Sequence, residues 1–219
     1  MRIAVLANGE WDIEWGRQEI APGNIEVLIC ADGGGNAAIS SGRLPDILVG
    51  DMDSIKEENL FICAQGKTKI KKYPAQKDET DLELAMEYAE EYLREYGKPK
   101  DEISLYGAGG KRLDHLMGNI SMMLAFAERG RMVRMIEPSQ EAWVLAPGEE
   151  MVKGTQGQVI SIIPLSAEAV VDSYGLYYPL KNSTMYQHSP RGISNVLIED
   201  EAKIKVAKGR ILVVKSKVL

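Results

Sequence analysis

The alternation of short apolar runs with helical patterns over the first 137 residues is the feature that most restricts the fold. Strands are predicted at residues 3–6, 26–31, 47–49, 69–73, 103–106 and 132–136. Residues 80–95 are the clearest helix, since Thr80 followed by Glu83 is typical of a helix start. Residues 113–129 form a second predicted helix, apolar enough to be mostly buried. Strands alternating with helices favour a largely parallel sheet with helices on both faces.

The pattern changes after Pro138. Short alternating runs follow at residues 159–163, 169–171, 195–198, 202–206 and 210–214, with turn residues between them and no long helical pattern. The runs on either side of Lys208-Gly209 predict a β-hairpin. We therefore expect a second, smaller antiparallel β domain, giving domains at residues 1–138 and 139–219.

Composition excludes several classes of protein. The 219 residues carry 32 acidic and 26 basic side chains, a net charge of −6, which disfavours non-specific binding to nucleic acid or to anionic membranes. No apolar run approaches the ~20 residues of a membrane-spanning helix. Two cysteines exclude a disulfide framework, and Cys30 lies in an apolar run, where it is expected to be a small buried hydrophobe. The mostly apolar run over the first seven residues ends at Asn8, which is too early for the core of a signal peptide. We therefore expect this run to be the first strand, and we expect a cytoplasmic protein.

Glycine and acidic residues gather in four loops that follow predicted strands or precede a predicted helix: residues 31–36, 49–54, 77–81 and 107–115. Ligands of open α/β sheets bind at the carboxyl ends of the strands, where all four loops are expected. The aspartates predicted to converge there are Asp32, Asp51, Asp53, Asp81 and Asp114.

Several ionised carboxylates in one place repel one another, and a hard divalent cation relieves that repulsion. Magnesium is favoured over zinc because neither histidine nor cysteine joins the group. In an extended segment, Asp51 and Asp53 would point to the same side. Magnesium bound in this way usually takes phosphate oxygens too, and the glycines would let backbone amides approach a polyphosphate. Lys77, Lys111 and Arg112 would supply positive charge.

Each motif also has a purely structural interpretation. Thr80 and Asp81 could simply cap a helix. Asp114 and His115 could likewise cap a helix and compensate its dipole. His188 is expected in a loop. Standard signatures of dehydrogenases, P-loop proteins and serine hydrolases are missing from the sequence. The joint placement of the acids at one edge favours the functional interpretation.

Six motifs, in order and spanning nearly the whole chain, resemble those of the thiamine pyrophosphokinase family. They are Ala31-Asp32-Gly33-Gly34, residues 45–54, Lys77-Asp78-x-Thr80-Asp81, Gly109-Gly110-x-Arg112-x-Asp114-His115, residues 175–180 and Gly192-Ile193-Ser194-Asn195. The resemblance implies a Rossmann-like, mostly parallel catalytic domain followed by a β-sandwich domain for thiamine binding and dimerisation. It also implies a homodimer with the active site at the subunit interface, ATP as co-substrate, and transfer of pyrophosphate to the thiamine hydroxyl with release of AMP.

The resemblance also assigns roles. Asp51, Asp53 and Asp81 match magnesium-binding acids, and Asp32 matches an active-site acid near metal or thiamine. Positions on the phosphate side are Lys77, Thr80, Arg112 and Asp114; those on the thiamine and nucleotide side are Ser194 and Asn195; Tyr178 stands where some relatives carry tryptophan. Arg112 would act catalytically, and either Asp32 or Asp81 would accept the hydroxyl proton.

Two other classes of function remain open at this point. One is a metal-dependent glycosyltransferase, because Asp-x-Asp motifs also bind nucleotide-sugar diphosphates through a divalent metal. The other is a non-catalytic thiamine or nucleotide sensor on the same fold. Retention of every acidic position favours catalysis over sensing.

Overall fold

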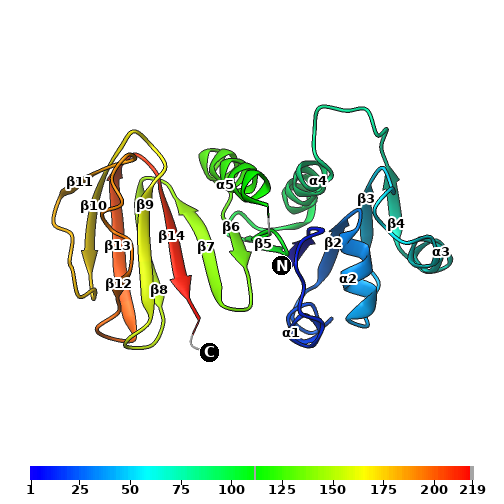
Figure 1. The fold of residues 1–219 in the computed structure, drawn as a ribbon, viewed down its shortest axis with the longest axis horizontal. Helices are drawn as coiled ribbons and strands as arrows, with labels where there is room; N and C mark the ends of the chain where they lie inside the picture. Colours follow the sequence, from blue (N-terminus) through cyan, green and yellow to red (C-terminus); the bar gives the residue numbers. More distant parts are fainter. Residues whose placement is uncertain (111, 218–219) are drawn as a thin grey trace. The chain divides into compact units, whose positions relative to one another are not determined.

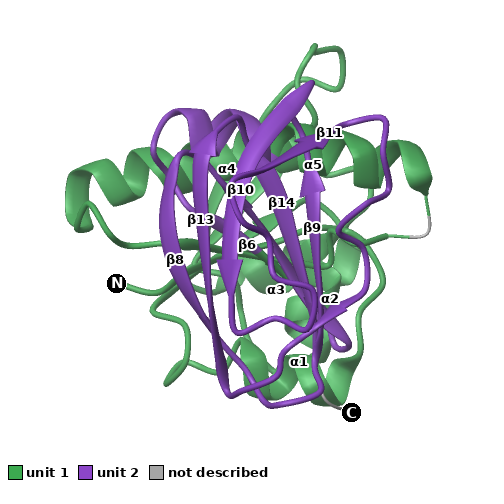
Figure 2. Ribbon diagram, turned by 90° about the vertical axis from the view of Figure 1, so that its left-hand side faces the viewer, with its two compact units in different colours: residues 1–122, 135–137 green, residues 123–134, 138–219 purple. Residues whose placement is uncertain are grey.

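The computed structural model describes residues 1–110 and 112–217, and Lys111 lies outside this described part. The chain forms two compact units, shown in different colours in Figure 2. The first comprises Met1–Met122 with Met135–Glu137, and the second comprises Met123–Arg134 with Pro138–Leu219. Within the described residues, no helix has the length and apolar character needed to span a membrane.

The first unit is built on a parallel sheet. Its strands are β1 (Ile3–Leu6), β2 (Val27–Ala31), β3 (Ile47–Gly50), β4 (Lys69–Lys72) and β5 (Ile103–Tyr106), in the order β5-β1-β2-β3-β4. Each neighbouring pair in this order is parallel. The predicted parallel sheet is therefore confirmed. Its inner strands β1, β2 and β3 are buried along their whole length, because both faces are covered.

Helices α1 (Ile13–Glu19), α2 (Gly34–Ser40) and α3 (Glu57–Gln65) connect β1 through β4, and α4 (Asp81–Tyr96) and α5 (Leu113–Glu128) follow β4 and β5. In Figure 1, α4 lies on the opposite side of the strands from α1 and α2. Right-handed crossovers explain this, because the chain moves outward from β1 to β4 and then returns across the sheet to β5. Because all five strands are parallel, their carboxyl ends lie at a common edge of the sheet.

The second unit contains two antiparallel sheets. One holds β7 (Gln140–Leu145), β14 (Ile211–Ser216), β9 (Val159–Pro164) and β12 (Asn195–Val196), in that order. The other, in the order β11-β10-β13-β8, holds β11 (Ser183–Tyr186), β10 (Glu168–Tyr174), β13 (Glu201–Lys208) and β8 (Gly148–Lys153). Buried side chains from both sheets form one core, which confirms the predicted β-sandwich. The strand β6 (Val133–Ile136) has residues in both units.

The hairpin predicted around Lys208-Gly209 is wrong. β13 pairs with β8 and β10, whereas β14 pairs with β7 and β9 in the other sheet. The alternation in the sequence is real, because Ile204 and Val213 both point into the sandwich core. Two strands that face each other across a core show the same pattern as two strands that pair edge to edge, so periodicity did not identify the partner.

Two expectations about individual elements also have clear outcomes. Cys30 is fully buried, as predicted, and burial raises the pKa of its thiol well above the usual range. The expectation that α5 is mostly buried is wrong, since only Met123 and Phe126 are fully buried and Leu113 and Met117 are exposed. Apolar content did not identify which residues of this helix are covered.

Candidate active site

Three aspartates meet at the carboxyl edge of the parallel sheet. Asp32 directly follows β2 and Asp51 directly follows β3, the neighbouring strand. Asp32, Asp51 and Asp53 each place a carboxylate oxygen within 4.8 Å of the others. Asp32 is buried, Asp51 is half-buried and Asp53 is exposed, so the group opens to solvent on one side. An all-oxygen donor set of this kind suits a hard divalent cation such as Mg²⁺.

Asp81, the first residue of α4, completes the group. Gly50 has φ +147°, and a Cβ at that position would lie 2.9 Å from Cβ of Asp32 and 3.1 Å from Cγ of Asp81. The two aspartates therefore pack on the same side of a residue that has no side chain. Only glycine allows both the backbone conformation and the close approach.

The buried Oδ1 of Asp81 has the ammonium of Lys77 as its partner, at 2.9 Å. This single positive charge leaves Asp32, Asp51 and Asp53 as a group of neighbouring carboxylates. A hard divalent cation bound among their oxygens would relieve the repulsion between them. The residues present therefore fit a divalent metal.

Lys77 lies among the acids. Its Nζ is 2.9 Å from Asp81 Oδ1 and 3.9 Å from Asp51 Oδ2, and its side chain is only 11% exposed. The contact with Asp81 raises the pKa of Lys77, so the ammonium stays charged at neutral pH. One positive charge therefore offsets part of the repulsion among the four carboxylates.

Asp32 also holds the neighbouring loop in place. Its Oδ2 accepts a hydrogen bond from Ser54 N at 2.9 Å and its Oδ1 accepts one from Ile55 N at 3.2 Å. Burial raises the pKa of the Asp32 carboxyl, the two N–H donors oppose that rise, and the charge of Asp81 adds to it. The residue has φ +39°, a conformation uncommon for a non-glycine residue and enriched at functional sites.

Asp51 and Asp53 converge through a turn. Met52 between them has φ +71°, and Asp51 Oδ1 accepts a hydrogen bond from Asp53 N at 3.1 Å. The expectation that an extended segment brings them together is therefore wrong, although the two side chains do meet. Aspartate commonly bonds to the backbone two residues on, and this local bond competes with an extended conformation.

The glycine-rich loops are explained first by close packing. A Cβ on Gly33 would lie 2.4 Å from the side chain of Asn8, and one on Gly34 would lie 2.2 Å from the carbonyl oxygen of Leu6. In the loop after β5, the N–H groups of Ala108 and Gly109 donate to Glu137 Oε1. These two amides are therefore used within the protein and are not directed at a polyphosphate.

The remaining residues predicted near the phosphates lie at helix starts. Thr80 caps α4, with its Oγ1 accepting from Glu83 N at 3.1 Å. Arg112 and Asp114 form a two-pronged ion pair, with an Nη2–Oδ2 distance of 2.6 Å and an Nε–Oδ1 distance of 3.2 Å. Both are exposed beside the loop after β5. Asp114 is thus paired with Arg112, and His115 is exposed on α5.

Tyr178, Ser194 and Asn195 lie together in the second unit. Asn195 is buried; its Oδ1 accepts from Tyr178 N at 2.9 Å and its Nδ2 donates to Tyr178 O at 2.7 Å. Tyr178 and Asn195, with Arg191 and Ile193, help to line a pocket of about 400 Å³. The ring of Tyr178 is exposed, and Ser194 has φ +59° with its N–H bonded to Ser161 Oγ. His188 lies in an exposed turn, as expected.

Three residues that shape these sites were missed at the sequence level as functional positions: Gly50, Glu137 and Arg191. A signal existed for Glu137, an acid directly after β6, which parallels the position of Asp51 after β3. Gly50 precedes Asp51, and its need for a positive φ carries no sequence signal beyond the glycine itself.

The chain is similar in sequence to proteins of one family. The family model described as "Thiamin pyrophosphokinase, catalytic domain" matches residues 22–135, and "Thiamin pyrophosphokinase, vitamin B1 binding domain" matches residues 149–211. The thiamine pyrophosphokinase of Bacillus subtilis is 31% identical over 190 residues, which cover 86% of each protein.

Solved structures agree with the sequence relatives. The crystal structure of Bacillus subtilis thiamine pyrophosphokinase aligns over 100% of both chains with a TM-score of 0.83 and 26% identity. That of Geobacillus thermodenitrificans thiamin pyrophosphokinase aligns over 100% of this chain and 98% of its own, with a TM-score of 0.82 and 27% identity. With both domains matched in order and the acids gathered at the sheet edge, the chain belongs to the thiamine pyrophosphokinase family.

Proposed function

We propose that this chain transfers pyrophosphate from ATP to the hydroxyl of thiamine, giving thiamine diphosphate and AMP. Membership of the thiamine pyrophosphokinase family carries the proposal, because both family domains and a relative of nearly the same length are matched. Neither the glycosyltransferase nor the non-catalytic sensor is supported by these matches. The clustered acids supply the chemistry that such a transfer needs.

Asp51, Asp53 and Asp81 are proposed to hold Mg²⁺, with Asp32 beside them. The oxygen-only donor set of the clustered aspartates supports this assignment. When bound, Mg²⁺ would neutralise charge on the phosphate oxygens as the bond to AMP breaks. The close packing of the carboxylates at Gly50 and the hydrogen bonds that Asp32 accepts from Ser54 N and Ile55 N support a preorganised site.

Lys77 and Arg112 are proposed to bind the triphosphate, with Thr80 and Asp114 beside them. Phosphoryl transfer depends mainly on positioning and on neutralising charge, so fixed cations near the phosphates lower the barrier. Asp114 holds Nε and Nη2 of the exposed Arg112 guanidinium, and the remaining N–H groups of its two Nη atoms would contact the phosphate oxygens. Attack by the thiamine hydroxyl would run in line with the leaving AMP oxygen.

A carboxylate is proposed to accept the proton of the thiamine hydroxyl. Asp32 and Asp81 remain the two candidates. Burial and the neighbouring Asp81 raise the pKa of Asp32, which makes it a better proton acceptor than an ordinary aspartate. Asp81 lies in the same group of acids, with its Oδ1 2.9 Å from Lys77 Nζ.

The second domain is proposed to bind thiamine, with the boundary after residue 138. Tyr178 would face the thiazolium cation through its exposed ring, and Ser194 and Asn195 would shape the same site. The pocket of about 400 Å³ beside Tyr178 is of a size that suits a small organic ligand.

A homodimer with its active site at the subunit interface is also proposed. Each unit carries exposed apolar side chains that an interface would cover: Leu113 and Met117 on α5, and Tyr177, Tyr178 and Ile193 in the second unit. We further propose that the protein works in the cytoplasm, where its two free cysteines would stay reduced.

One assay tests the proposed reaction. The purified protein is incubated with ATP, Mg²⁺ and thiamine, and the products are separated by chromatography. AMP and thiamine diphosphate in equal amounts are expected. ADP with thiamine monophosphate would show a different phosphoryl transfer, and binding of thiamine without any AMP would show a sensor.

A further inference from the structure

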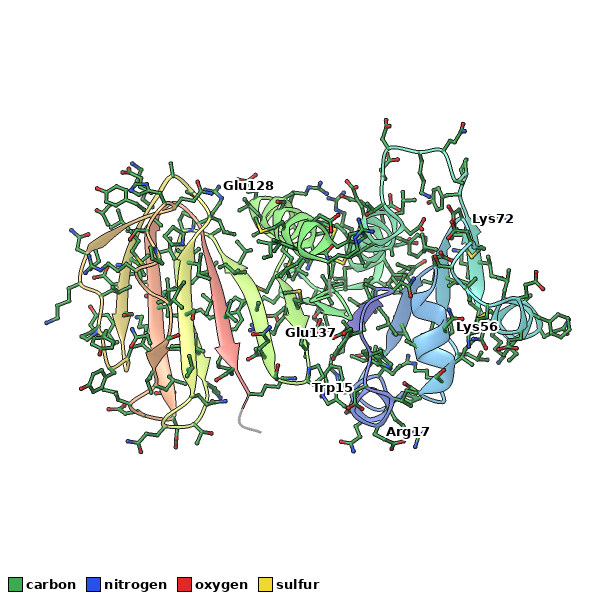
Figure 3. The ribbon with its side chains drawn as sticks, in the orientation of Figure 1. Trp15, Arg17, Lys56, Lys72, Glu128 and Glu137 are labelled. Carbon is green, nitrogen blue, oxygen red and sulfur yellow. The ribbon has the colours of Figure 1, made fainter. Side chains whose placement is uncertain are left out.

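Glu137 extends from the C-terminal end of β6 to the loop after β5 (labelled in Figure 3). Its Oε1 accepts hydrogen bonds from Gly109 N at 2.7 Å and from Ala108 N at 3.2 Å. Hydrogen bonds from backbone N–H groups to an ionised carboxylate are stronger than those between neutral groups. A single carboxylate oxygen therefore fixes two successive peptide groups of this loop.

The loop is shaped to receive that carboxylate. A Cβ on Gly109 would lie 2.8 Å from Glu137 Oε1 and 3.0 Å from its Cγ, so a residue with a side chain could not lie so close. The flanking Gly107 and Gly110 have φ +61° and +33°, conformations that glycine adopts readily. Gly109 thus serves the contact with Glu137, whereas a Cβ on Gly107 would instead lie 3.0 Å from the carbonyl oxygen of Ala7.

Asn119 fixes the loop from the other side. Its Nδ2 donates a hydrogen bond of 2.8 Å to the carbonyl oxygen of Ala108, whose own N–H is bonded to Glu137. Both polar backbone groups of Ala108 are therefore held by side chains. Ala108 itself is only 2% exposed, so this segment is an anchored point at the sheet edge.

The exposed ion pair of Arg112 and Asp114 begins two residues beyond this anchored segment. Arg112 is 68% exposed, and its side chain is held by Asp114 of α5. Asn119 of the same helix is bonded to Ala108, so the anchored loop is tied to the helix that carries the partner of Arg112. We propose that Glu137, assisted by Asn119, is a positioning residue of the transfer reaction: it holds residues 107–110 so that Arg112 meets the phosphates of ATP. This inference rests on the proposed role of Arg112.

A purely structural role for Glu137 would lower the stability of the protein without a specific effect on ATP. A positioning role instead raises the KM for ATP and leaves the KM for thiamine close to that of the wild type. It also predicts that the effect of removing Glu137 is lost when Arg112 is already absent, because residues that act through one another are not additive.

The experiment compares Glu137→Ala, Glu137→Gln, Arg112→Ala and the double variant Glu137→Ala/Arg112→Ala. The control is Glu14→Gln, which removes an exposed acid on α1 paired with Arg17. KM for ATP, KM for thiamine, kcat and the melting temperature are measured for each. Asn119→Ala provides a second route to the same loop if Glu137→Ala does not fold.

Glu137→Ala is expected to raise the KM for ATP about tenfold. Glu137→Gln should recover part of the loss, because an amide oxygen still accepts the N–H groups. In the Arg112→Ala background, Glu137→Ala should add less than about twofold. Equal effects in both backgrounds, or an unchanged KM for ATP in Glu137→Ala and Asn119→Ala, would overturn the positioning role. An unchanged KM for ATP in Arg112→Ala would instead overturn the phosphate role of Arg112.

Discussion

Asp32 and Asp81 lie on the same side of Gly50, where any other residue would carry its Cβ. The arrangement brings together the end of β2 and the start of α4, which lie far apart in the sequence. A side chain at position 50 would occupy the space in which these two acids lie.

Gly50→Ala tests this relationship. The new Cβ would lie 2.9 Å from Asp32 Cβ, and φ +147° is strained for alanine. We expect the free energy of unfolding to fall by about 1–3 kcal/mol, with a loss of turnover larger than that destabilisation explains. Urea denaturation and turnover at saturating substrates measure the two effects. Gly23→Ala is the control, since a Cβ there meets nothing within 4 Å.

Lys77→Met should change how the protein responds to Mg²⁺. Lys77 pairs with Asp81 and lies near Asp51, so its removal leaves the acids more repulsive until a cation binds. The variant should melt at a lower temperature than the wild type without Mg²⁺ and gain more from added Mg²⁺. Thermal unfolding across a magnesium titration measures this. An equal Mg²⁺-induced shift in both proteins would show that Lys77 does not offset the acids.

Thr80→Ala should lower stability, since Thr80 Oγ1 caps α4 by accepting from Glu83 N. Loss of an N-cap costs about 1 kcal/mol, and Thr80→Ser should keep the cap. If Thr80 also contacts phosphate, Thr80→Ala raises the KM for ATP while Thr80→Ser does not. Urea denaturation with ATP-dependent kinetics separates the two roles, and a KM unaffected by Thr80→Ala would leave only the cap.

Asn195→Ala should act on thiamine through Tyr178. Both ends of the buried amide bond to the backbone of Tyr178, so the loop carrying the ring loses its anchor. We expect a higher KM for thiamine, an unchanged KM for ATP and a stability loss of about 2 kcal/mol. Steady-state kinetics with each substrate varied in turn makes the measurement. A rise in both KM values would contradict a role confined to the thiamine side.

Much of the first unit could be predicted because its physical signals are local. β1 and β5 were predicted at their observed bounds, and the start of α4 was indicated by Thr80 with Glu83. The gathering of Asp32, Asp51 and Asp53 followed from a single rule, that parallel strands end at one edge. Periodicity and this rule need no knowledge of distant contacts.

The failures came where partners had to be identified. The pattern of β13 and β14 gave the buried faces of both strands but not the sheet to which each belongs. The apolar residues of α5 showed that the helix is hydrophobic, but they did not show which of its residues are exposed to solvent. The turn at Met52 depends on a local hydrogen bond, and composition does not encode it. The contacts of Glu137 join the end of β6 to the loop after β5, and the spacing of residues does not encode them.

The most direct test of the central claim is the magnesium dependence of Asp53→Ala. If Asp53 helps to hold Mg²⁺, turnover at saturating ATP, thiamine and Mg²⁺ should fall by at least ~100-fold, while Glu14→Gln keeps the wild-type rate. Isothermal calorimetry with Mg²⁺ and ATP should show weaker metal binding for the variant. A near-normal rate for Asp53→Ala at saturating Mg²⁺ would contradict the account.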